Sequence, residues 1–83
     1  IIMQELINKY DKQIYLNLDN HSQFLIDFME ELEDNYSDLE VGAEETFKEA
    51  VIYKIETILE VIKESEDKNL LYNLKQELEK CEI

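Results

Sequence analysis

The stretch from Ala43 to Glu64 constrains the fold most, because it is the longest run whose pattern fits one unbroken helix. At about 100° per residue its apolar positions cover an arc of roughly 200°, which is wider than one buried stripe requires. Such a helix needs neighbours on more than one side, and at 1.5 Å per residue it spans about 33 Å. The apolar positions are Phe47, Ala50, Val51, Ile52, Ile55, Ile58, Leu59, Val61 and Ile62.

The rest of the composition favours helices over sheets. The 83 residues include no proline, one glycine and no tryptophan, so long elements are easier to build than tight turns. Hydrophobic residues make up 45% of the chain, enough for a core and too many for a disordered acidic tail. We therefore predict one all-α domain over residues 1–83, a small antiparallel bundle of three to four helices around the long central helix.

The first half of the chain predicts two helices. The first begins near the N-terminus and reaches at least Asp11, but residues 13–18 alternate apolar and polar side chains as a strand does. A lone strand lacks an internal partner, so either this segment pairs with another chain or the helix continues to Leu18, which we favour. A turn at residues 19–22 follows, with Asn20 or Ser22 as the N-cap of a second helix, from Gln23 to about Tyr36.

The last helix is predicted from Lys68 to Glu82. Its apolar residues form a narrow stripe at alternating spacings of three and four, as in a helix packed antiparallel on its neighbour. The same stripe also fits a homodimer contact. Its members are Leu71, Leu74, Leu78 and Cys81.

Lys54 points into the apolar arc of the long helix, because it lies seven residues from both Phe47 and Val61. We expect its stem to pack on the core while its ammonium reaches a carboxylate at the surface. The alternative is a desolvated lysine with a chemical role and a lowered pKa.

The sequence lacks the residue patterns of known catalytic and metal sites. It contains no glycine-rich phosphate loop, no HExxH motif and no cysteine cluster, and the one histidine, His21, lies among turn residues as a surface or capping residue would. A calcium loop at residues 34–40 has its glycine at the wrong offset. We therefore predict no enzyme activity, no cofactor and no metal. The single cysteine and the lack of a membrane-span or signal pattern lead us to expect a cytoplasmic protein.

The net charge of −13 narrows the class of partner. The chain has 21 acidic residues against eight lysines and no arginine. This charge opposes binding to nucleic acid or to anionic membranes. Any charged partner should therefore be basic.

Acidic residues are concentrated on the polar side of the second helix. Neighbouring carboxylates at spacings of three and four cost about 0.2–0.5 kcal/mol per pair in an isolated helix. Lysine usually relieves this repulsion, yet none occurs between Lys12 and Lys48, a window with ten acidic residues. We predict a partner-binding surface here, with Tyr36 as a central anchor. Its acidic members are Asp27, Glu30, Glu31, Asp34 and Asp38, extended by Glu40, Glu44 and Glu45.

Carboxylates one helical turn apart are about 5–6 Å from each other, a spacing comparable to that of successive phosphates on one nucleic-acid strand. The sequence thus predicts an inhibitor of a nuclease or another nucleic-acid-binding protein. In size, charge and helical pattern the chain resembles the small acidic inhibitors of phages and plasmids, which include nucleic-acid mimics, anti-CRISPR proteins and bacteriocin immunity proteins. The alternative is a helical adaptor that acts through homodimerisation or helix docking, using the stripe of the last helix or residues 14–18.

Overall fold

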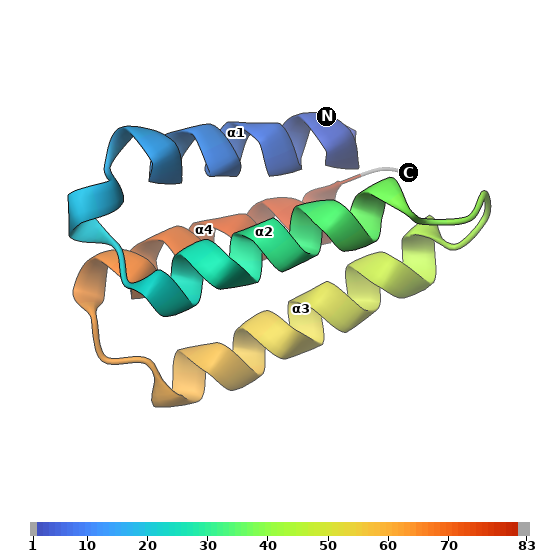
Figure 1. The fold of residues 1–83 in the computed structure, drawn as a ribbon. Helices are drawn as coiled ribbons and strands as arrows, with labels where there is room; N and C mark the ends of the chain where they lie inside the picture. Colours follow the sequence, from blue (N-terminus) through green and yellow to red (C-terminus); the bar gives the residue numbers. More distant parts are fainter. Residues whose placement is uncertain (1, 82–83) are drawn as a thin grey trace.

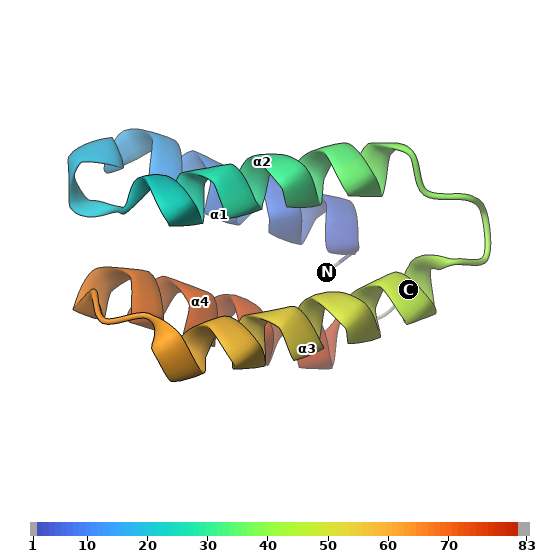
Figure 2. The ribbon, with the colours of Figure 1, turned by 60° about the horizontal axis from the view of Figure 1, so that its bottom comes forward.

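The computed structural model describes residues 2–81 as an all-helical bundle without strands, which confirms the predicted fold class (Figure 1). The helices form two layers, α1 with α2 and α3 with α4 (Figure 2). The principal extents of the molecule are 35 × 24 × 19 Å. The elements are α1 (Met3–Leu16), the 3-10 turn η1 (Leu18–Asn20), α2 (Gln23–Ser37), α3 (Glu44–Val61) and α4 (Ser65–Lys80).

Between the two layers lies one hydrophobic core to which every helix contributes. Leu6, Leu25, Ile55 and Leu71 are each at most 1% exposed, one from each helix in turn. At about 25 cal/mol per Å² of apolar surface removed from water, such side chains supply most of the driving force for folding. Within the described residues, no helix has the length and apolarity that a membrane crossing needs.

The long helix α3 is less enclosed than its sequence predicts. Only Val51, Ile55 and Ile58 are buried, whereas Val61 is 71% exposed. The reason is that α3 lies at one corner of the bundle (Figure 2). Its own layer and the opposite layer therefore cover only the side of α3 that faces the interior. Of the predicted apolar positions, Ala50 and Val61 are therefore exposed, and those that are neither exposed nor buried pack partly buried against the core.

Residues 13–16 continue α1 as a helix, as the favoured interpretation of this segment expects, but α1 ends at Leu16 and Leu18 begins the 3-10 turn η1. The strand alternative is wrong. Ile14 is buried, while Tyr15 and Leu16 are 73% and 68% exposed, so the alternation reflects the two sides of a helix end. The 3-10 turn η1 then reverses the chain.

The connection between α2 and α3 depends on the only glycine. Gly42 has φ +94°, a backbone conformation that side-chain-bearing residues rarely adopt. Its N–H donates to Oε2 of Glu44 at 3.0 Å. Helix α3 then begins at Glu44.

Helix α4 begins at Ser65, three residues before the predicted start at Lys68. The predicted end at Glu82 lies outside the described residues. The apolar stripe from Leu71 to Cys81 is buried inside the chain, at 0–4% exposure. The structure thus uses this stripe for the core, and the proposed dimer contact through it is wrong.

Candidate functional site

The acidic row, defined as Asp27, Glu30, Glu31, Asp34 and Asp38, lies on the exposed side of α2. Four of its members fall within about 60° of arc around the helix axis, and Glu30 lies at the edge nearest α1. The opposite side of α2 buries Leu25, Phe28, Met29 and Leu32. The separation of charged and apolar sides predicted from the sequence is therefore present in the fold.

The row extends toward the end of α2 where negative charge is least favourable. Asp34 lies in the last turns of the helix and Asp38 is its C-cap, and the last turn contains no basic residue. The helix macrodipole places partial negative charge at this end, so carboxylates here are repelled by the backbone as well as by one another. The presence of Asp34 and Asp38 is therefore not explained by a contribution to the stability of α2.

Local structure does account for Glu44 and Glu45, which the sequence assigns to the same surface. Both lie in the first turn of α3, where the helix dipole favours negative charge. Glu44 accepts a hydrogen bond from Gly42, and Oε1 of Glu45 lies 3.6 Å from Nζ of Lys48. Glu40 is exposed in the connection between α2 and α3.

Lys54 crosses from α3 to the acidic row. Its Nζ lies 3.4 Å from Oε1 of Glu31 and 5.5 Å from the centroid of the Phe28 ring. The side chain is 52% exposed, which confirms that the stem packs on the core while the ammonium reaches a surface carboxylate. An exposed pair of this kind contributes about 0–1 kcal/mol, so it relieves little of the repulsion along α2.

Tyr36 faces the core edge more than the row. The side chain is half-buried, and its ring lies 5.8 Å from that of Phe47, tilted by 51°. This contact joins the end of α2 to the start of α3. Tyr36 thus supports the connection beside the row, where the sequence predicts an anchor for a partner.

A groove of about 920 Å³ lies between α1 and α2, beside the acidic row. Its charged lining residues are Asp11, Lys12, Glu30 and Glu33. The neighbouring Asp11 carboxylate, partial burial, and the charges of Asp34 and Glu30 together raise the pKa of Glu33. Two carboxylates are therefore held together across the groove, and among the described residues neither takes part in an ion pair. This cluster could not be predicted from the sequence, because Asp11 and Glu33 meet only when α1 and α2 pack.

We expect Glu33→Gln to raise the free energy of unfolding by about 0.2–0.5 kcal/mol at pH 7 and low salt, because it removes repulsion by Asp11. The raised pKa means that the folded state binds a proton more readily than the unfolded state does. The penalty is therefore present at neutral pH and disappears as the pH falls below the ordinary glutamate value. Urea denaturation at pH 7 and about pH 4 measures both effects. An equal gain at both pH values would contradict this origin.

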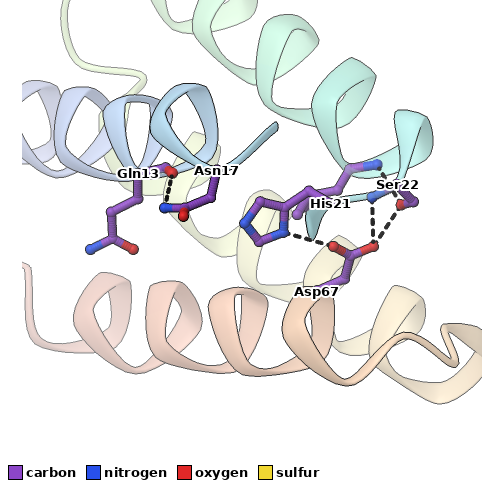
Figure 3. Close-up of polar contacts among 6 residues, drawn as sticks. Gln13, Asn17, His21, Ser22 and Asp67 are labelled. Carbon is purple, nitrogen blue, oxygen red and sulfur yellow. Dashed lines mark hydrogen bonds and ion pairs between the residues drawn. The ribbon is translucent and has the colours of Figure 1, made fainter. Parts of the chain in front are cut away.

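The buried polar centre of the molecule joins η1, α2 and α4, and sequence reasoning missed it. The Asp67 side chain is fully buried at the start of α4. Its Oδ2 accepts hydrogen bonds from Oγ of Ser22 at 2.6 Å and from the Ser22 backbone N–H at 3.3 Å, while Oδ1 lies 2.9 Å from Nδ1 of His21 (Figure 3). Because a carboxylate only accepts hydrogen bonds, Nδ1 of His21 carries the hydrogen.

This network is a connection between helices. Ser22 Oγ also accepts from the N–H of Leu25, so the N-cap of α2 is attached to the first turn of α4. His21 has a side chain only 8% exposed, so the predicted surface histidine is largely enclosed. Serine and histidine both contact the same carboxylate, an arrangement that differs from a catalytic triad, in which histidine lies between the other two residues.

Within residues 2–81, no three His, Cys, Asp or Glu side chains are placed to share a metal ion. Comparison with family models, curated proteins and solved structures finds no match.

Proposed function

We propose that this chain is a small acidic inhibitor or immunity-type protein that binds the basic, nucleic-acid-binding surface of a partner protein. The acidic row supports this proposal. Its five carboxylates extend over about 17 Å of helix, or one charge per roughly 4 Å. A single nucleic-acid strand carries one phosphate per about 3.4 Å of helix axis, so the row has a similar charge density.

The poor stability of this charge arrangement is the observation that carries the proposal. Along α2 the carboxylates repel one another, and Asp34 and Asp38 oppose the helix dipole. Among the described residues, Glu31 is the one member of the row that pairs with a lysine. A positively charged surface would relieve both the repulsion and the opposition to the helix dipole. The proposed partner is a nuclease or another nucleic-acid-binding protein, as for anti-CRISPR or anti-restriction mimics, and the protein itself contacts neither nucleic acid nor membrane.

The proposal is tested by salt dependence and competition. Immobilised protein should capture a basic partner from host lysate, and duplex DNA or structured RNA should displace that partner because both ligands share one surface. The association rate constant should fall about tenfold or more between low and moderate salt, because steering by unpaired charge is screened. Capture that resists both salt and nucleic acid would contradict the proposal.

A second candidate, a helical adaptor that forms a homodimer, is supported by the exposed side of α3. Tyr53 and Val61 are each 71% exposed there, at the two edges of a stripe of uncharged residues about 80° wide that Glu60 and Lys54 border. An uncharged surface is where two copies of a −13 chain repel least. Sedimentation velocity discriminates the candidates: a dimer that persists at high salt and dissociates in Tyr53→Gln favours the adaptor, and a monomer excludes it. The uncharged positions are Thr46, Ala50, Tyr53, Thr57 and Val61.

A further inference from the structure

The groove between α1 and α2 has a different character at each end. The helices are antiparallel and joined through η1, so Tyr15, Leu18 and Ile26 line the groove near η1. Further from η1, Asp11 on α1 lies opposite Glu30 and Glu33 on α2. The end near η1 thus presents these apolar side chains beside His21 and Gln23, and the other end is acidic.

The apolar end is open to a ligand. Tyr15 is 73% exposed and Leu18 is 45% exposed, although both are large hydrophobic side chains next to a concave surface. Exposed apolar surface beside a groove is typical of an interaction site. An apolar side chain inserted here would cover both residues.

The acidic end selects the charge of the ligand. Three carboxylates face one lysine, Lys12, and the repulsion between Asp11 and Glu33 remains in the free protein. A second copy of the chain would bring another −13 toward these carboxylates, so it is a poor occupant. A cationic side chain would instead reduce the repulsion.

We propose that this groove binds an amphipathic basic helix of the partner, with an apolar anchor between Tyr15, Leu18 and Ile26, and Lys or Arg side chains one to two turns away beside Asp11, Glu30 and Glu33. The inference rests on the proposed function, because it specifies where and how a basic partner docks. Helices of this type bind grooves through apolar anchors spaced three or four residues apart. Glu30 belongs to both the groove and the acidic row, so one partner can cover both surfaces.

The test uses three synthetic peptides of about 15 residues, long enough to form a helix when bound. One has leucines on one helical side and lysines on the other, the second has the same composition scrambled, and the third carries the same number of lysines in a leucine-free, alanine-based sequence. Binding is measured by fluorescence anisotropy. We expect the amphipathic peptide to bind at least about tenfold more tightly than either of the others.

The groove is located with two matched double variants. Tyr15→Gln with Leu18→Gln should weaken binding of the amphipathic peptide about tenfold or more, since it removes the apolar anchor site without changing charge. Tyr53→Gln with Val61→Gln removes similarly exposed apolar surface from α3 and should change binding less than about twofold. Both variants should retain the helical circular dichroism of the original chain, because all four side chains are exposed.

Three results overturn the inference, and they separate it from the proposed function. If the groove variant binds the amphipathic peptide as tightly as the original chain does, the groove is not its site. If the alanine-based lysine peptide binds as well as the amphipathic one and loses binding with salt, the basic-partner proposal stands and the groove inference alone fails. If no peptide binds at low salt, both fail.

Discussion

Asp67→Ala should lower the free energy of unfolding by about 2–4 kcal/mol, because it removes a fully buried side chain that accepts three hydrogen bonds. His21 and Ser22 would then be left partly buried with unpaired donors. For a domain of this size, each 1 kcal/mol shifts Tm by roughly 4–8 °C, so a loss of about 10–30 °C is expected. This is a large part of the stability of a small domain.

Urea denaturation followed by circular dichroism measures this loss. Asp19→Ala is the matched control, because Asp19 is exposed in the neighbouring turn η1 and should change stability by less than about 0.5 kcal/mol. Asp67→Asn should lie between the two, since its amide oxygen still accepts while its NH₂ faces a donor. An Asp67→Ala variant as stable as the control would show that the network does not connect the helices energetically.

The Asp67 contribution should also depend on pH. Burial raises the pKa of Asp67, but hydrogen bonds from Ser22 and His21 outweigh burial and hold this pKa below its ordinary value. The unfolded state therefore binds a proton at higher pH than the folded state does, and stability rises with pH in that range. The difference between the original chain and Asp67→Asn should be complete above about pH 5 and should shrink as the pH falls below the ordinary aspartate value near 4. A difference independent of pH would contradict this assignment.

The fold was predictable because its main determinants are local. Apolar residues at helical spacing mark each helix, and the order of Leu71, Leu74 and Leu78 predicts a buried stripe that the structure contains. How many sides of a helix are covered is a property of the assembled bundle, however. Val61 has the same apolar character as Val51, yet it is exposed because the helix lies at a corner.

The candidate site was predictable where one helix determines it. The acidic row follows from spacing within α2, and the Lys54 contact follows from its position on α3. Asp67 could not be found this way, because an acid in the first turn of a helix normally faces solvent and favours the dipole. Its partners lie 45 and 46 residues away, so only the assembly of the bundle brings the residues before α2 to the first turn of α4. The Asp11 and Glu33 pair has the same origin.

Neutralising three carboxylates of the acidic row should weaken binding to the basic partner about 10²–10³-fold while leaving the protein folded. The variant combines Asp27→Asn, Glu31→Gln and Asp34→Asn, which avoid the groove and preserve side-chain shape. Unfolding free energy should stay the same or rise by up to about 1 kcal/mol, because relieved repulsion exceeds the lost pairing of Glu31 with Lys54. Loss of binding with no loss of stability is expected when charges are kept for a partner rather than for the fold.

The matched control removes the same charge elsewhere. Glu49→Gln, Glu60→Gln and Glu64→Gln are exposed positions of α3 and the connection after it, and together they give the same net charge as the row variant. If the row is the binding surface, this control should weaken binding less than about threefold, since distant exposed charges act mainly through screened long-range attraction. Equal weakening by both variants would mean that only net charge matters. The row would then serve solubility, as acidic surfaces on small proteins commonly do.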